Sequence, residues 1–321
     1  MRRLAAVLLL VVLTGGAVAA TYETMPAELA AKWLSSPSAS EGWNETGYDT
    51  DGWVPVTYDL AVAYPNWMTP EQQAMHQFMW HPAGNNNGQT VYFRRQLWVG
   101  GHVTDAFFRV CADDQFRFFV NGRLVGGARE SGATRSFAVG EDFRPGANMV
   151  AAEARDMMGG GYGLLVMGEV TQEWPFMTEE QAWRCDVSVG SGWIESDYDD
   201  AQWQHAVADR APAIEVGNRR YQCFTTPEDL SDFASACFRR NLDLDGVPVS
   251  AQVTILGDDS YQLYVNGKLM ALERRVDYAY RPACVDITSA LHAGRNTLAV
   301  KITNTWGPAR LYCLPVVKMA F

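Results

Sequence analysis

The sequence predicts an all-β protein built from two tandem β-sandwiches, and three observations support this fold class. The chain of 321 residues carries the same set of motifs twice. Its apolar residues alternate with polar ones at a period of two, as they do in half-buried strands. Turn dipeptides such as Asn-Gly separate these short runs, whereas helical signals are few. Many short strands joined by turns are typical of an antiparallel sandwich.

The repeat is seen when corresponding motifs of the two halves are aligned. The segments YFRRQL at 92–97 and CFRRNL at 237–242 correspond, and so do DDQFRFFVNGRL at 113–124 and DDSYQLYVNGKL at 258–269. Gly146-Ala147-Asn148 likewise matches Gly294-Arg295-Asn296 in the second half. Since the anchors keep the same order with little drift, we interpret the chain as an internal duplication. Tryptophans recur at a fixed offset of 150: Trp33, Trp43 and Trp53 match Trp183, Trp193 and Trp203.

The domain organisation follows from the length of the copies and from the first twenty residues. Each copy has about 145 residues, which is the size of an independent domain. Residues 1–20 combine two arginines with an apolar run and small residues, the layout of a secretory signal peptide. We therefore expect a signal peptide at 1–20, sandwiches at 21–172 and 180–321, and a linker at 173–179. The short linker contains Trp174, which favours packed rather than loosely tethered domains.

The charge balance narrows the classes of partner. The formal net charge is −11, from 26 basic and 37 acidic side chains. Nucleic-acid and anionic-membrane partners need a basic stripe, so neither is expected. No second apolar run reaches spanning length, and we expect no membrane insertion. The predicted location is secreted or extracellular.

The strands and turns are clearest in the second copy. Tyr261, Leu263 and Val265 alternate with polar or exposed positions, and Asn266-Gly267 then permits the positive φ angles of a type I′ hairpin. Further strands are expected at 249–256, 295–303 and 309–317. Segments 69–79 and 226–236 both begin with Thr-Pro, which predicts a short helix in each copy.

The chain has six cysteines, an even number that suggests disulfides in an exported protein. Six cysteines allow fifteen pairings, and the sequence does not choose among them. Five of them follow residue 180, so Cys111 either bridges the halves or stays a buried thiol. No cysteine or histidine spacing typical of a zinc site is found. The cysteines are Cys111, Cys185, Cys223, Cys237, Cys284 and Cys313.

The ordered set of motifs resembles a known group of sandwiches. The FRR segments, the Asp-Asp and Asn-Gly elements of each hairpin, and VDITSALHAGRNTLAVKITN at 285–304 carry the resemblance. Together they resemble the N-terminal sugar-binding domain of family 2 glycoside hydrolases and the jelly-roll domains that accompany α-L-rhamnosidases. The resemblance implies two galactose-binding-like jelly-roll sandwiches over residues 30–170 and 180–318.

The chain departs from these hydrolases in one respect. In that family the sandwich precedes a barrel with two catalytic carboxylates, whereas this sequence ends a few residues past the second sandwich. The resemblance therefore implies the accessory module without the enzyme, and no catalytic residue is assigned.

The repeated polar motifs admit a structural and a functional interpretation. Adjacent aspartates in a strand point to opposite faces, so Asp113-Asp114 and Asp258-Asp259 are expected to satisfy backbone donors rather than to flank a glycosidic bond. A structural calcium ion at these pairs is left open; otherwise no cofactor or metal is predicted. The FRR arginines are expected to form surface ion pairs. The shared tryptophans are expected in the core.

Candidate ligand-binding residues are the aromatic, arginine and amide side chains of loops, where sugars often stack. The tryptophans without a counterpart are considered for the same role: Trp67, Trp80, Trp98 and Trp306. The residues assigned are Tyr278, Tyr280, Arg281, Asn304 and Trp306 in the second copy, and Arg129, Arg135 and Tyr162 in the first.

The function predicted from these observations is a secreted, non-catalytic, lectin-like protein that binds a glycan or glycoprotein. One alternative is a structural or adhesion subunit of an extracellular assembly, whose partners are other protein subunits. Another is an accessory fragment of a glycoside hydrolase system.

Overall fold

The computed structural model describes residues 33–58, 62–84, 88–157, 161–175, 183–228, 230–274, 280–305 and 309–321. The predicted signal peptide at 1–20 and two predicted site residues, Tyr278 and Trp306, lie outside the described residues. Within them, no helix is long and apolar enough to cross a membrane.

Strands are the main regular structure of the described chain and helix is scarce, which confirms the all-β prediction. Its helical elements are α1 (Pro70–Met75) and two 3-10 turns, η1 (Gly140–Asp142) and η2 (Thr288–Ala290). The first-half strands are β1 (Leu34–Ser36), β2 (Val54–Pro55), β3 (Thr90–Val99), β4 (His102–Asp113), β5 (Gln115–Val120), β6 (Arg123–Ala128), β7 (Thr134–Ala138), β8 (Gly146–Arg155) and β9 (Gly163–Glu173). The second-half strands are β10 (Arg184–Asp186), β11 (Gln204–His205), β12 (Val207–Ala208), β13 (Ile214–Val216), β14 (Arg219–Tyr221), β15 (Phe224–Thr225), β16 (Ser235–Leu244), β17 (Pro248–Asp258), β18 (Ser260–Val265), β19 (Lys268–Arg274), β20 (Ala283–Asp286), β21 (Gly294–Thr303) and β22 (Arg310–Ala320).

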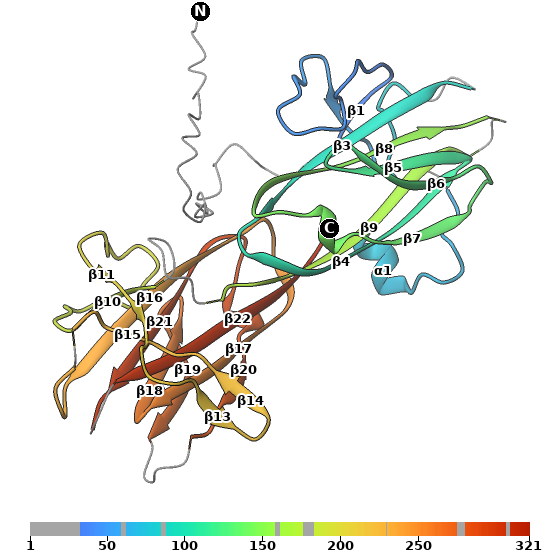
Figure 1. Cartoon of the computed structure of the whole chain (residues 1–321). Helices are drawn as coiled ribbons and strands as arrows, with labels where there is room; N and C mark the ends of the chain where they lie inside the picture. The colour runs from blue at the N-terminus through green and yellow to red at the C-terminus, as the bar shows by residue number, and fades with distance from the viewer. Residues whose placement is uncertain are drawn as a thin grey trace, which may run out of the picture.

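The two halves contain six-stranded antiparallel sheets of matching strand order. The order is β2-β1-β3-β8-β5-β6 in the first half and β11-β10-β16-β21-β18-β19 in the second. Each sheet packs across an apolar core onto strands of a third sheet, which contains β4, β7 and β9 from the first half and β17, β20 and β22 from the second. Figure 1 shows the resulting two sandwiches. The duplication itself stays an interpretation of the sequence.

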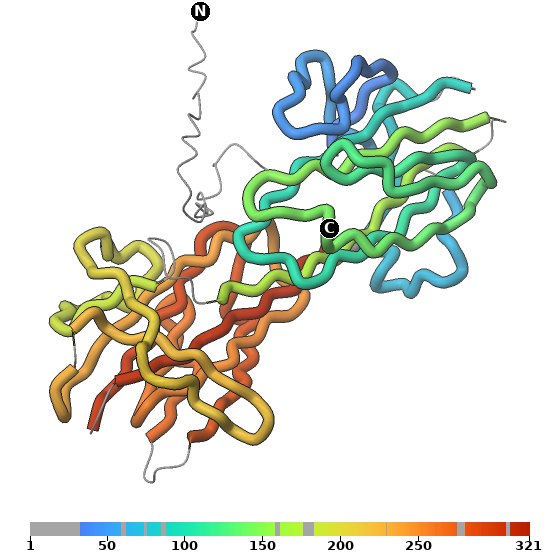
Figure 2. Tube along the Cα trace, viewed as in Figure 1, coloured from blue at the N-terminus to red at the C-terminus, as the bar shows by residue number. Residues whose placement is uncertain are grey.

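The two halves are joined by a continuous ladder of main-chain hydrogen bonds. β22 pairs with β9 from Val316↔Glu173 to Ala320↔Glu169, so the last strand of the second half lies beside the last strand of the first (Figure 1). The trace in Figure 2 shows the red C-terminal strand running into the green first half. The halves therefore share one sheet at this junction.

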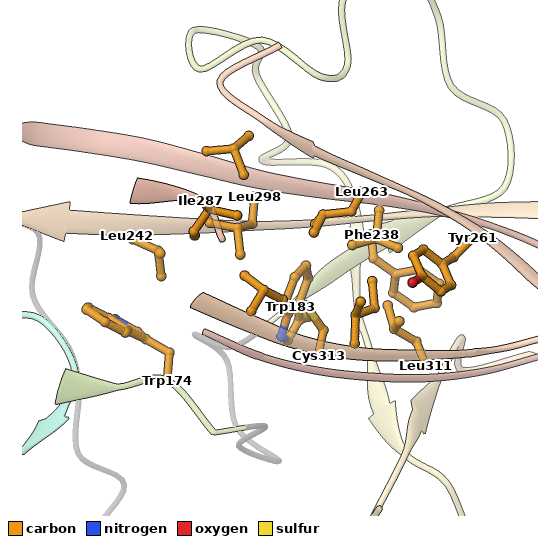
Figure 3. Packing of buried hydrophobic residues seen from close by; sticks show 14 of the residues in the cluster. Trp174, Trp183, Phe238, Leu242, Tyr261, Leu263, Ile287, Leu298, Leu311 and Cys313 are labelled. Carbon is orange, nitrogen blue, oxygen red and sulfur yellow. The ribbon is translucent and has the colours of Figure 1, made fainter. Parts of the chain in front are cut away.

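The segment after β9 contributes to the second core. Trp174 is 3% exposed and belongs to the same apolar cluster as Leu242. Figure 3 shows its ring below Leu242, at the margin of the side chains that surround Trp183 and Phe238. The backbone N–H of Trp174 donates to the Pro315 carbonyl at 3.0 Å. The predicted linker region thus begins as packed structure.

The Asn-Gly turns take the predicted conformation and explain why two motifs recur together. Asn121 has φ 47° and Gly122 φ 82°, while Asn266 and Gly267 have 47° and 79°, as a type I′ turn requires. The Asn121 amide donates to Asn148 Oδ1 at 2.9 Å, and Asn266 makes the equivalent bond to Asn296 at 2.8 Å. The Gly-x-Asn motif therefore fixes the hairpin turn in both halves.

The paired aspartates have the predicted structural role. Asp114 accepts a hydrogen bond from the Met157 N–H at 2.7 Å, and Asp259 accepts one from the Thr305 N–H. These bonds tie the start of each hairpin to the end of a neighbouring strand. Throughout the described part of the chain, no group of three or more acidic, histidine or cysteine side chains is arranged to hold a metal ion.

Of the two predicted helices, only the first forms. Thr69 caps α1 in a capping box with Gln72. In the second copy the described residues of 226–234 contain turns and bends but no helix. The Asn304 amide donates to the Leu230 carbonyl at 3.1 Å, and Phe233 adopts φ 63°. The Leu230 carbonyl is therefore bonded to a side chain instead of to a helical N–H, and the positive φ of Phe233 is incompatible with a right-handed helix.

The six cysteines are free thiols, five buried and Cys284 exposed, so the expected disulfides are absent from the structure. The adjacent strands β10 and β16 show the reason. Cys185 pairs with Phe238, and Cys237 pairs with Asp186, so the two thiols are one position out of register. Side chains one position apart face opposite sides of a sheet. Cys111 takes the second of its two predicted states, a buried thiol.

Candidate functional site

The candidate site is a cavity of about 280 Å³ at the junction of the two halves. It is named the junction cavity, because Phe321 follows β22 of the second half while its other lining residues come from the first. The lining combines aromatic rings with a guanidinium group and polar side chains. It consists of Trp33, Tyr58, His76, Gln77, Met79, Arg95, Val166 and Phe321.

Arg95 reaches the cavity because of the alternation of β3. Phe93 and Leu97 are 0% and 1% exposed and lie in the first-half core. Since residues two apart share a face, Arg95 between them points to the core side of the sheet. A cation on this side is unusual, because burying a charge without a partner is costly.

The Arg95 guanidinium has an aromatic neighbour and an unpartnered donor. Its central carbon lies 5.4 Å from the centre of the Phe321 ring. Its Nε is buried and has no hydrogen-bond partner among the described residues. Burial lowers the pKa of Arg95, and the charges of Asp245 and Tyr58 act in the opposite direction. The guanidinium therefore carries hydrogen-bonding capacity that the surrounding protein does not use.

The main chain around the cavity is fixed by hydrogen bonds. Phe321 and Gly168 exchange two bonds of 2.7 Å, which places the Phe321 ring at the cavity. Met79 and Leu164 exchange bonds of 2.8 and 3.0 Å. Two pairs of main-chain hydrogen bonds therefore hold the lining, the kind of support that keeps a binding site in one geometry.

His76 ends α1 and completes the polar side of the cavity. Its N–H donates to the Gln72 carbonyl at 2.9 Å. Burial lowers the pKa of the His76 imidazole, with Glu169 acting to raise it and Arg95 acting to lower it. The imidazole is therefore neutral at pH 7, and the positive charge of the lining comes from Arg95.

The equivalent arginine of the second half is hydrogen-bonded to the protein backbone. Arg240 is 5% exposed, and its Nη1 donates to the carbonyls of Trp174 at 3.1 Å and Pro175 at 2.9 Å. The segment after β9 thus supplies the acceptors at this position. The two halves differ at their core-side arginine: one donates to backbone oxygens and the other lines a cavity.

The outer arginines are buried rather than at the surface, and of the two only Arg239 has an ion pair among the described residues, with Asp200 at 2.9 Å. Arg94 is 4% exposed and donates to the carbonyls of Trp43 at 2.9 Å and Glu45 at 3.0 Å. Arg239 is 1% exposed and reaches the corresponding carbonyls of Trp193 and Glu195, in addition to Asp200. The tryptophan-containing loop covers this face of the sheet, which strand alternation alone does not reveal.

The predicted second-half site residues do not form one exposed cluster where they are described. Tyr280 is half-buried, and its hydroxyl donates to Asp258 at 3.2 Å. Asn304 is 0% exposed and is engaged with the carbonyl of Leu230. Arg281 is exposed. Asn304 therefore has a structural contact where a ligand contact was expected.

The predicted first-half site residues are also separate from the junction cavity lining. Arg129 and Arg135 are exposed, and Arg135 lies 3.9 Å from Glu130. Tyr162 is half-buried, with its ring 5.5 Å from that of Trp80.

The burial of the tryptophans agrees only in part with the sequence-based prediction. The shared ones are buried or half-buried, as predicted for core residues. Among those without a counterpart, Trp80 and Trp98 are 0% and 5% exposed and belong to the interior, contrary to the ligand-binding interpretation. Trp67 is 36% exposed and lies 5.2 Å from the Arg109 guanidinium carbon.

A second concavity of about 860 Å³ lies in the first half, beside the start of β4 and the η1 turn. Its lining includes Asp105, Glu141 and Asp142, and Arg123 is paired with Asp142. Phe143 is its aromatic residue and is 8% exposed. Because its Arg123 cation is already paired with Asp142, this surface offers a ligand less unused hydrogen-bonding capacity than the junction cavity.

None of the residues that line the junction cavity was among the ligand-binding residues predicted from the sequence. Those candidates were chosen from loops, whereas Arg95 lies inside a strand. The usable signal was the alternation of Phe93, Arg95 and Leu97, which puts a cation on an otherwise apolar face. Phe321 could not be assigned, because its position depends on the pairing of β22 with β9.

Comparisons with known proteins agree with the resemblance seen in the motifs. No model of a known protein family matches the chain. Over 144 residues, 43% of the chain, it is 31% identical to an α-L-rhamnosidase from Streptomyces avermitilis, and this match spans 13% of that protein's length.

Three solved structures align with the chain at low TM-scores. The crystal structure of the Streptomyces avermitilis α-L-rhamnosidase with L-rhamnose aligns with 91% of this chain and 29% of its own, at 19% identity and a TM-score of 0.29. The structure of the Pleurotus ostreatus lectin with GalNAc aligns with 75% of this chain and 77% of its own, at 21% identity and a TM-score of 0.26. A Bacteroides uniformis β-glucuronidase aligns with 86% of this chain and 27% of its own, at 12% identity and a TM-score of 0.30.

Proposed function

We propose that this chain is a secreted, non-catalytic carbohydrate-binding protein and that the junction cavity is its binding site. The observation that carries the proposal is that aromatic rings and the Arg95 guanidinium line one cavity. Aromatic side chains suit the apolar face of a sugar, and Arg donors suit its oxygens. The sequence relationship to an α-L-rhamnosidase adds support, since that enzyme's name refers to a carbohydrate substrate.

The size and chemistry of the cavity favour one sugar ring. Its volume of about 280 Å³ lies just below the roughly 300–1,000 Å³ common for small-molecule sites. The proposal of a non-catalytic role is supported by the described residues of the lining, none of which is Asp or Glu. Hydrolysis of a glycosidic bond ordinarily uses two carboxyl groups that flank it. The proposal of secretion is supported by the composition of residues 1–20.

A glycan array of neutral and acidic saccharides tests this proposal, with wild type, Tyr58→Ala and Trp67→Ala run in parallel. Tyr58 lines the cavity and is 44% exposed, whereas Trp67 is a partly exposed ring outside it. We expect selective binding by wild type, at least tenfold weaker binding by Tyr58→Ala, and unchanged binding by Trp67→Ala. A blank array from folded wild type would contradict the proposal and favour the assembly subunit. Equal losses in both variants would contradict the site.

A further inference from the structure

Arg95 stands out among the four arginines of the FRR motifs because of its partners. Three of them donate to backbone carbonyls: Arg94 at 2.9 Å, Arg239 at 3.0 Å and Arg240 at 2.9 Å. Arg95 has the Phe321 ring beside it, and its buried Nε lacks a hydrogen-bond partner in the described chain. A buried donor without an acceptor costs about 1–3 kcal/mol. Because Arg95 lines the junction cavity, a ligand bound there would lie beside this guanidinium.

The charge at the site indicates which oxygen fits best. Among its described residues, the lining holds the Arg95 cation and no Asp or Glu, in a chain whose net charge is −11. Asp245 is the carboxylate whose charge acts on Arg95, but it accepts the Trp98 N–H at 3.3 Å. No ion pair joins Asp245 to Arg95 in the described structure. The cavity therefore offers a cation that no lining residue neutralises.

A planar guanidinium matches one anionic group especially well. It binds a carboxylate through two parallel hydrogen bonds, which are stronger than bonds to neutral acceptors. The neighbouring rings of Phe321 and Trp33 provide apolar surface for the body of a sugar. An acidic sugar combines both features in one molecule.

From this arrangement we infer that the junction cavity selects a sugar that carries a carboxylate, a uronic acid, with the Arg95 guanidinium binding the carboxylate. The inference rests on the proposed function, because it names the class of sugar for the same cavity. It predicts that the acidic sugar binds more tightly than the neutral sugar of the same ring configuration.

The test is isothermal titration calorimetry of the full chain with matched ligands. Methyl glucuronide is compared with methyl glucoside, and methyl galacturonide with methyl galactoside. We expect at least one uronide to bind at least tenfold more tightly than its neutral partner, with the preference falling as salt is raised. Sodium acetate tests whether the carboxylate alone suffices.

Three variants connect the preference to Arg95. Arg95→Gln should abolish the preference, while Arg95→Lys should retain part of it, because the charge remains but the bidentate geometry is lost. Arg117→Gln is the matched control: this exposed arginine pairs with Glu153 at 3.0 Å and should keep wild-type selectivity. Thermal melting of each variant shows that it is folded.

The outcomes separate the two proposals. Equal binding of uronide and neutral sugar by wild type would overturn the acidic-sugar inference and leave carbohydrate binding standing. Acetate binding as tightly as the uronide would overturn it too, because the sugar ring would contribute nothing. Binding of neither sugar would contradict both proposals, and an unchanged preference in Arg95→Gln would remove Arg95 from the recognition.

Discussion

The two halves use their paired arginines alike on one face of the sheet and differently on the other. Arg94 and Arg239 both bind the backbone of a tryptophan loop, through the carbonyls of Glu45 and Glu195 respectively. On the core side, Arg240 binds carbonyls of the segment after β9, whereas Arg95 lines the junction cavity. A motif present twice can therefore have one role that is common to both copies and another that differs.

The difference depends on what the chain places beside each arginine. Trp174 enters the second core and brings its own carbonyl and that of Pro175 to Arg240. Beside Arg95 the corresponding neighbour is the Phe321 ring, which offers a π face and no hydrogen-bond acceptor of ordinary strength. This contrast leads to four predictions.

The largest effect is expected for the outer arginine of the second half. Arg239→Ala removes bonds to three carbonyls and to Asp200, and leaves these partly buried acceptors without that donor. We expect the free energy of unfolding to fall by about 3–5 kcal/mol. Arg94→Ala removes two carbonyl bonds and should cost less, about 2–3 kcal/mol. Urea unfolding followed by tryptophan fluorescence measures both, and equal costs would refute the ranking.

The core-side arginines should respond in opposite ways to removal of their charge. Arg240→Met leaves the Trp174 and Pro175 carbonyls unsatisfied and should cost about 2–4 kcal/mol. Arg95→Met removes a buried donor that has no protein acceptor. It should leave the free energy of unfolding within about 0.5 kcal/mol of wild type, or raise it. A similar loss in both variants, measured by the same urea titration, would show that Arg95 has a structural partner.

The junction should also make stability depend on pH through Asp245. Burial raises the pKa of this carboxyl to about 6, although the Trp98 hydrogen bond and Arg95 act to lower it. The folded chain then binds more protons than the unfolded chain between about pH 4 and 6, so stability falls as pH rises through this window. The free energy of unfolding should fall by no more than about 3 kcal/mol across this window.

The comparison that isolates this effect is Asp245→Asn, which keeps an oxygen for the Trp98 N–H. The wild type should lose stability relative to this variant as the pH rises from about 4 to 6, and the difference should be constant above that range. Parallel stability curves for the two proteins across the whole range would exclude Asp245 as the source.

The smallest effect is expected from reductant. The five buried thiols should not react in the native state, and burial raises the pKa of Cys185, Cys223 and Cys237 to about 12. A thiol reagent should modify only Cys284 in the folded protein and all six cysteines after denaturation without reductant. Reductant should leave the melting temperature unchanged. Fewer than six reactive thiols in the denatured, unreduced chain would reveal a disulfide.

The sequence predicted features that local chemistry controls. Asn121-Gly122 and Asn266-Gly267 specify their turns through positive φ angles, and the period of two specifies the strands. It did not predict which face of a strand another segment would cover. Arg94 was expected at the surface because the alternation does not show the tryptophan loop that packs over it.

The residues of the proposed site were missed for a related reason. Loop aromatics were favoured, yet Trp80 and Trp98 are buried by contacts between distant strands. The junction cavity requires the pairing of β22 with β9, which brings Phe321 to Arg95 across more than 200 residues of sequence. Strand pairing over such a distance is set by the tertiary fold and leaves no local pattern.

The most direct measurement is a crystal structure of the chain soaked with methyl glucuronide and, separately, with methyl galacturonide. The account predicts a sugar in the junction cavity, with its carboxylate about 2.7–2.9 Å from the Arg95 guanidinium nitrogens and its ring against Phe321 or Trp33. A sugar bound at another site, or one in this cavity whose carboxylate points away from Arg95, would contradict the account.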